Sequence, residues 1–210
     1  RGGERVKYDL KKDRKDLYAP GKHDFTRVTV PPMTYLAIDG HGDPNTSPAY
    51  TDAVSALYAS GYAIKFAFKA RTGDDVVVGP LEGLWSSADP ASFADRRKDA
   101  WDWTMLIPLP PAVTDADIRA GLETAARKKP ELPIGRVSAV TIDEGLSLQI
   151  LHVGSYEAET PTLHRLHAEL MPAQGLTFNG PHHEIYLSDP RRVAPEKLKT
   201  ILRQPVRAID

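Results

Sequence analysis

The sequence predicts an α+β fold built from two β-α-β-β repeats, in which an antiparallel sheet and helices line a central ligand groove. Three signals recur in the same order in both halves of the 210-residue chain. A hydroxyl residue before proline starts a helix, a glycine follows that helix, and an Asp-Pro pair ends a later strand. These signals lie at Ser47-Pro48, Gly61 and Asp89-Pro90, and again at Thr160-Pro161, Gly175 and Asp189-Pro190. Such internal similarity indicates a duplicated unit with a pseudo-twofold axis.

The first repeat is expected over residues 25–110. Strand-like runs occur at 25–30, 33–38, 76–87 and 101–108. The helix that starts after Ser47 carries an apolar stripe on one face, and Gly61 is expected to end it. Residues 62–70 alternate in polarity as a strand does, but they are equally consistent with a continued helix, so both alternatives stand. The polar segment 93–99 is expected to be helical.

The second repeat is expected over residues 134–210. Its strand-like runs are 146–153, 181–187 and 197–209. Its helix carries an apolar stripe at Leu163, Leu166, Leu170 and Met171. Two segments lie outside the repeats: residues 1–24, whose charges alternate in sign, are expected to form a solvated arm, and 111–133 a connecting helix with a proline-containing linker.

Composition excludes several classes of function. A net charge of -1 leaves no basic surplus for holding nucleic acid by its phosphates. The apolar runs are much shorter than the roughly 18 residues of a membrane span. The chain has no cysteine, which rules out disulfides and thiolate catalysis. With no apolar segment after the charged N-terminus, these features favour a cytoplasmic protein.

The segment 181–190 contains the strongest candidates for chemistry. In a strand, side chains alternate between two faces, so His182, Glu184 and Tyr186 are expected to share one face. If that face meets an apolar cavity, Glu184 is a candidate general base and Tyr186 a proton donor. Burial of the acid predicts a raised pKa. Glu82 is the symmetry-related candidate, with weaker support because a glycine follows it.

Aromatic residues are the candidates for binding a flat apolar ligand. Core packing explains any single one of them equally well. The candidates, together with His182 as a polar contact, are Trp85, Trp101, Trp103, Tyr156 and Tyr62.

The sequence offers no cofactor or metal site. His182 and His183 are neighbours on a strand and point to opposite faces, so they are poorly placed to bind one ion. The chain has no HExxH, P-loop, GxGxxG or GxSxG motif. We therefore expect chemistry without a cofactor, a metal or a covalent intermediate.

These segments resemble the GyrI-like family, the small-molecule-binding domain shared by gyrase-inhibitor-like proteins and the effector domains of multidrug-sensing regulators. The resemblance covers about residues 8–209. It is carried by 62–65, 78–85, 101–103 and 183–191, and above all by Leu-Glu-Gly-Leu-Trp and Glu-Ile-Tyr-Leu-Ser-Asp-Pro-Arg. No helix-turn-helix segment occurs, so the resemblance is to the stand-alone branch. It implies a cyclopropanoid cyclopropyl hydrolase that detoxifies spirocyclopropyl dienones of the yatakemycin and duocarmycin type, with Glu184 in the groove.

Two classes of function follow from the residues and the resemblance. The first is an enzyme in which Glu184 accepts a proton from water as the water opens the strained ring. The second is a module that binds, sequesters or senses lipophilic or cationic drugs, for which aromatic faces and a carboxylate are equally suited. A third, a module acting on a topoisomerase, rests on the resemblance alone. In the first two, the partner is a small aromatic or lipophilic ligand, and the chain is a monomer or homodimer.

Overall fold

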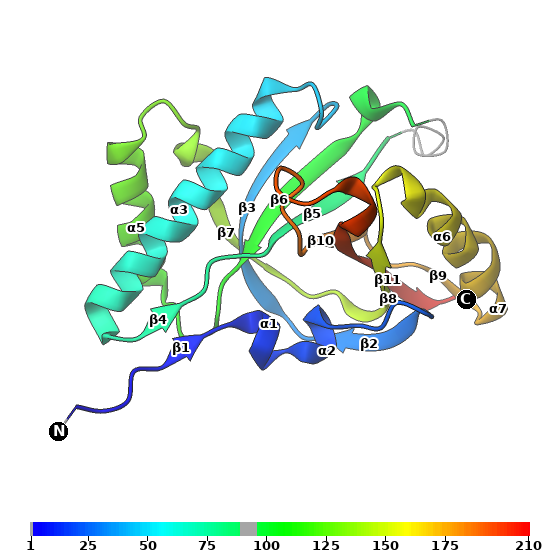
Figure 1. The fold of residues 1–210 in the computed structure, drawn as a ribbon, viewed down its shortest axis with the longest axis horizontal. Coiled ribbons are helices and arrows are strands. Elements are labelled where there is room, and N and C mark those ends of the chain that lie inside the picture. Colours follow the sequence, from blue (N-terminus) through cyan, green and yellow to red (C-terminus); the bar gives the residue numbers. More distant parts are fainter. Residues whose placement is uncertain (1, 89–95) are drawn as a thin grey trace. The chain divides into compact units, whose positions relative to one another are not determined.

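The computed structural model describes residues 2–88 and 96–210 and confirms an α+β fold with antiparallel sheet strands and helices (Figure 1). The chain divides into two compact units, residues 1–13 with 33–142, and residues 14–32 with 143–210. The predicted strand end at Asp89-Pro90 and part of the predicted helix at 93–99 lie outside the described residues. In the described part, no helix is long and apolar enough to span a membrane.

Unit 1 contains four antiparallel strands in the order β5-β6-β3-β7. Their bounds are Leu81–Ser86 for β5, Asp102–Pro108 for β6, Met33–His41 for β3 and Ser138–Ile142 for β7. Buried Tyr35, Ala37 and Leu106 form a core cluster on this sheet. A short parallel pair, β1 (Lys7–Tyr8) with β4 (Asp75–Val76), is also present, and a 3-10 turn, η1 (Lys98–Ala100), precedes β6.

The helix α3 (Pro48–Thr72) runs straight through the glycine that was expected to end it. Proline occupies its first turn as predicted, and the segment left open at 62–70 is helical. Gly61 is buried, and a Cβ there would lie 3.1 Å from Val78, so this glycine allows close packing inside the helix. The helix ends at Gly73, whose φ of 79° is a left-handed conformation that favours glycine.

Helix α5 (Asp115–Lys128) packs against α3, and the two lie side by side in Figure 1. Thr114 and Asp117 form a capping box at its start. Asp117 also accepts hydrogen bonds of 2.8 and 2.9 Å from Arg71 of α3. These bonds from Arg71 lower the pKa of Asp117 to about 2, although burial opposes the shift.

The two helices approach each other closely at Gly121. A Cβ on this residue would lie 2.6 Å from the backbone nitrogen of Ile64, which cannot move independently of α3. We therefore expect Gly121→Ala to reduce the free energy of unfolding by roughly 1–3 kcal/mol, despite the better helix propensity of alanine. Urea unfolding measures this, with Gly135→Ala as the control, since nothing lies within 4 Å of a Cβ there. Equal stability of both variants would contradict the close approach.

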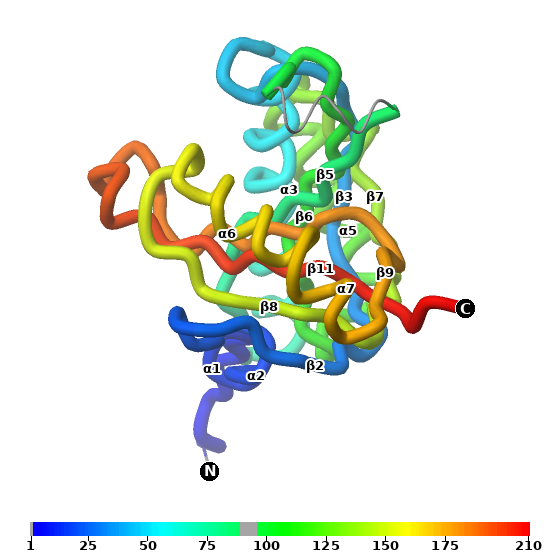
Figure 2. Tube along the Cα trace, turned by 90° about the vertical axis from the view of Figure 1, so that its right-hand side faces the viewer, coloured from blue at the N-terminus to red at the C-terminus, as the bar shows by residue number. Residues whose placement is uncertain are grey.

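Unit 2 has four antiparallel strands in the order β10-β11-β8-β2, and β9 pairs with the end of β11. Their bounds are His182–Tyr186 for β10, Lys199–Ala208 for β11, Gly145–Val153 for β8, Thr26–Val30 for β2 and Leu176–Phe178 for β9. Figure 2 shows β2, β8 and β11 side by side in this order. Leu148, Leu166, Met171, Leu176 and Val206 form a buried cluster against the helical segment.

That helical segment follows the predicted second helix, but it is irregular. It consists of a 3-10 turn η3 (Glu157–Glu159), α6 (Thr160–Arg165), a π-helical turn η4 (Leu166–Leu170) and α7 (Met171–Ala173). The remaining turns are η2 (Ile134–Arg136) and η5 (Pro195–Lys197). Gly175, with φ of 67°, follows the helix as predicted.

The two units share an order of strands. The order is β5-β6-β3 in unit 1 and β10-β11-β8 in unit 2. β5 and β10 pair with β6 and β11, and these pair in turn with β3 and β8. The first strand of each predicted repeat is the outer strand of the unit that holds the rest of the other repeat, since β2 pairs with β8 and β7 pairs with β3. The common order agrees with duplication, while the axis relating the halves stays a prediction.

The N-terminal arm is exposed along most of residues 2–24, as expected for a solvated segment, but three of its side chains are buried. Leu17 is 0% exposed, Tyr18 is 3% exposed, and Leu10 is also buried. These residues lie in two one-turn helices, α1 (Leu10–Asp13) and α2 (Lys15–Tyr18). The alternating charges lie on the outside of these turns, while the apolar residues between them join the core.

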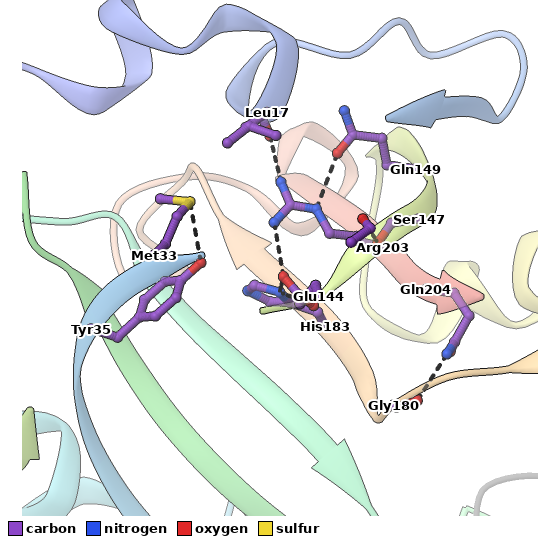
Figure 3. Close-up of polar contacts among 11 residues, drawn as sticks. Leu17, Met33, Tyr35, Glu144, Ser147, Gln149, Gly180, His183, Arg203 and Gln204 are labelled. Carbon is purple, nitrogen blue, oxygen red and sulfur yellow. Dashed lines mark hydrogen bonds and ion pairs between the residues drawn. The ribbon is translucent and has the colours of Figure 1, made fainter. Parts of the chain in front are cut away.

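A buried polar network holds α2 on unit 2 (Figure 3). Arg203 donates to the carbonyl oxygen of Leu17 at 2.8 Å and to Gln149 at 3.2 Å. It also contacts Glu144 at 3.4 Å, and Glu144 accepts from His183 Nδ1 at 2.9 Å. Burial raises the pKa of Glu144, but His183 and then Arg203 outweigh it, so the pKa lies below its ordinary value.

Candidate functional site

Strand β10 separates its side chains by face as predicted. His183 and Ile185 are 1% and 0% exposed. His183 is taken up by the buried network with Glu144. His182, Glu184 and Tyr186 lie on the other face and contact one another. The two adjacent histidines therefore have different partners.

Glu184 is the centre of this second face and is 9% exposed. His182 Nε2 lies 2.7 Å from its Oε2, and the Tyr186 hydroxyl donates to its Oε1 at 3.2 Å. Since an ionised carboxylate only accepts hydrogen bonds, His182 is the donor through Nε2. Both carboxylate oxygens thus receive a donor from the same strand face.

The predicted rise in the pKa of Glu184 is wrong. Burial does raise it, and this is the largest single effect. Hydrogen bonds from His182, Glu159 and Tyr186, with the charge of His182, together outweigh burial and place the pKa below its ordinary value. The sequence indicated the burial but not the number of donors. Glu184 is therefore ionised at neutral pH.

Two further residues from the segment before α6 complete the cluster. The rings of Tyr156 and Tyr186 meet edge to face, with centroids 6.0 Å apart. Burial, and then the charges of Glu184 and Glu159, raise the pKa of Tyr156 to about 12, so its hydroxyl keeps its proton at neutral pH. Tyr156 was predicted as a ligand contact. Glu159, 5% exposed and hydrogen-bonded to Glu184, was missed.

No pattern in the sequence distinguishes Glu159 as a site residue. It lies just before the Thr160-Pro161 helix start, where an acidic residue is ordinarily explained by the helix dipole. Only its approach to β10 distinguishes it from a surface acid. We define the β10 site as Tyr156, Glu159, His182, Glu184 and Tyr186.

The other predicted site residues lie in unit 1. Glu82 is completely buried on β5, opposite Leu106, as Glu184 on β10 is opposite Leu202. Trp85 and Trp103 face each other across β5 and β6. Tyr62 lies on α3 with 49% of its surface exposed.

The three tryptophans form an aromatic cluster with Tyr50. Trp85 meets Trp101 with centroids 5.9 Å apart, and Tyr50 meets Trp103 at 5.3 Å. Trp103 lies directly over Gly40, where a Cβ would come within 2.0 Å of its ring. Tyr50 of α3 is therefore part of this cluster. Trp85 and Trp103 are buried in unit 1, and Trp101 is half-buried.

The chemistry available at the β10 site is proton transfer and hydrogen bonding. It has an ionised carboxylate, neutral phenols and an imidazole within one buried cluster. Among the described residues, no three His, Asp or Glu side chains are arranged to hold a metal ion. Buried polar groups converging beside aromatic rings are typical of a small-molecule-binding domain.

Comparison with known proteins agrees with that class. The model of the GyrI-like small molecule binding domain matches residues 23–207, and the chain belongs to this family. No curated protein matches the chain.

Solved structures similar to the chain include proteins from Listeria innocua. An uncharacterized conserved protein is 42% identical, with a TM-score of 0.86, over 95% of this chain and 100% of that one. A hydrolase encoded by lin2189 is 40% identical, with a TM-score of 0.84, over 96% and 100%. The C-terminal domain of EcmrR, 10% identical with a TM-score of 0.54 over 88% and 98%, shares the fold alone.

Proposed function

We propose that this protein is a cofactor-independent hydrolase that opens the three-membered ring of electrophilic spirocyclopropyl dienones, of the yatakemycin and duocarmycin type, as a detoxification reaction. The observation that carries the proposal is the buried Glu184 carboxylate, held by His182 and Tyr186 beside the neutral Tyr156 hydroxyl. The similarity to a Listeria innocua hydrolase supports an enzyme over a pure binding module.

The reaction needs one proton acceptor and one proton donor. Water attacks the cyclopropane CH2, a new C–O bond forms, and the C–C bond to the spiro carbon breaks. The released electron pair makes the dienone aromatic and places negative charge on its oxygen. In the proposal, Glu184 accepts the proton that the attacking water loses, and Tyr186 or Tyr156 donates one to the phenolate oxygen.

The strained ring explains why so few groups are enough. The substrate is already reactive, so positioning the water and stabilising the developing charge supply the rate enhancement. The lowered pKa of Glu184 makes it a weaker base, but it keeps the carboxylate ionised at neutral pH. In the same proposal, Glu82 is a second candidate acid, and Trp85, Trp101, Trp103 and Tyr62 are ligand contacts.

Turnover of a spirocyclopropyl dienone by the full chain tests the proposal. We expect the dienone absorbance to disappear with many turnovers, and mass spectrometry to show one added water in the product. Stoichiometric protection of the dienone without product would instead support binding and sequestration. No interaction with the dienone would rule out both functions for this ligand class.

A further inference from the structure

We infer that β7 pairs with the same strand of a second copy of the chain, so that two copies form a homodimer with one continuous antiparallel sheet. β7 (Ser138–Ile142) is the outer strand of unit 1 and pairs with β3 on one side. On its other side, no strand of the described residues pairs with it. Alternate residues of such an edge direct their N–H and C=O groups outward, where another strand can bind them.

β7 lacks the features by which proteins usually protect an exposed sheet edge. Its sequence, Ser-Ala-Val-Thr-Ile, contains no charged residue and no proline. Ser138, Ala139 and Thr141 are exposed. The outer strand of unit 2 differs, because β2 carries Arg27, which is held by hydrogen bonds of 2.7 and 3.1 Å to Gln174. β7 is therefore the edge that is open to pairing.

The apolar core of unit 1 extends to this edge. Val140 and Ile142 of β7, with Met33 of β3, are partly buried and pack against the core cluster that contains Tyr35. Val140 lies opposite Tyr35, and Ile142 lies opposite Met33, so these side chains share one face of the sheet. A strand added beyond β7 covers the exposed part of Val140 and continues the apolar face across the edge.

Charges at the two ends of β7 make the strand complementary to a copy of itself. Arg136 precedes the strand, Asp143 follows it, and both are exposed. Arg136 is held at the start of the strand by a hydrogen bond to the carbonyl oxygen of Asp39. Two strands related by a twofold axis run antiparallel, so Arg136 of each copy lies near Asp143 of the other. A second copy of this chain is thus the partner that the edge fits.

The length of the strand selects the register. With the twofold axis at Val140, this residue faces itself across the interface, Ala139 faces Thr141, and Ser138 faces Ile142. All five residues are then paired, whereas a shift by two residues leaves two of them without a partner. A shift by one residue would place the apolar and polar side chains on the wrong faces.

Analytical ultracentrifugation of the full chain tests the pairing without any substrate. Two five-residue strands form an interface below the standard size, so we expect a reversible dimer with a Kd of about 1–100 µM. A monomer at every concentration up to about 1 mM would overturn the homodimer. Assemblies that keep growing beyond a dimer would overturn the twofold pairing, because a closed pair leaves no further β7 edge.

Two double variants of exposed residues test which side chains face each other. Ala139→Lys with Thr141→Lys sets like charges opposite each other, and we expect the Kd to rise at least about tenfold. Ala139→Lys with Thr141→Glu sets opposite charges there, and we expect a Kd within about threefold of wild type. Circular dichroism checks that both variants are folded.

Thr29→Lys on the exposed part of β2 is the matched control, and we expect it to leave the Kd unchanged. Equal affinities of the two double variants would overturn the register. A loss of affinity in Thr29→Lys as large as in the double lysine variant would place the interface elsewhere and overturn the inference.

The chain has no cysteine, so one introduced thiol reports on the geometry of the interface. Val140→Cys places two thiols opposite each other at the axis, where the Cα separation of about 4.5–5.5 Å in an antiparallel pair suits a disulfide. In Ala139→Cys the thiols are offset along the strands. We expect Val140→Cys to form a covalent dimer in a glutathione buffer at least about tenfold faster than Ala139→Cys. Equal rates, or no covalent dimer of Val140→Cys, would overturn the pairing at Val140.

Discussion

We expect Glu184→Gln to reduce the turnover of a spirocyclopropyl dienone by about 10²- to 10⁴-fold, the usual contribution of a general base. The amide has the size of the carboxylate, but it cannot accept a proton from the attacking water. Its NH2 group would also face the donors His182 and Tyr186, which now bind the carboxylate oxygens. Single-turnover kinetics at several pH values measure the loss.

Two other Glu→Gln substitutions provide the comparison for the loss of turnover in Glu184→Gln. Glu169→Gln changes an exposed acid of the same unit, and we expect it to leave turnover unchanged. Glu82→Gln tests whether the buried acid of unit 1 also takes part in the reaction. A loss of turnover as large as in Glu184→Gln would indicate two active acids. Turnover at the wild-type rate in Glu184→Gln would remove the base from the proposed mechanism.

The largest effect on stability is expected from Arg203→Met. Arg203 has a completely buried side chain that links Glu144, Gln149 and the Leu17 carbonyl. The methionine fills part of the space but leaves Glu144 with one cation fewer and the end of α2 without its donor. Breaking a buried ion pair by removing one partner costs about 3–5 kcal/mol, and we expect a loss of that size in urea unfolding.

The same network makes stability depend on pH. The folded pKa of Glu144 lies below its ordinary value, so its ionisation stabilises the fold above that value. This contribution is lost as the pH falls through the folded pKa. Glu144→Gln is therefore expected to be less stable than wild type at neutral pH and to lose less stability on acidification.

The surface pair of Arg14 and Asp16 is the matched control for the buried network. Its side chains are 36% and 52% exposed, so Arg14→Met should change the free energy of unfolding by less than about 1 kcal/mol. A similar small change in Arg203→Met would mean that α2 is not held by this network.

Local patterns in the sequence predicted much of the fold. The alternation of 182–186 placed Glu184 with His182 and Tyr186, and the structure agrees. A connecting helix was expected within 111–133, and α5 lies there. Gly61 misled because a glycine that ends a helix and one that admits a neighbour look the same in a sequence. The neighbour, Val78, is 17 positions away and is brought there by tertiary packing.

The same limit applies to the candidate site. The sequence alone determined which residues could do proton chemistry and which of them share a strand face, because both depend on near neighbours along the chain. Only the tertiary structure decided that Glu159 meets Glu184, that Arg203 secures the N-terminal arm, and that the pKa of Glu184 falls. Burial and donors act on a carboxylate in opposite directions, and which one prevails depends on contacts between segments that are far apart in the sequence.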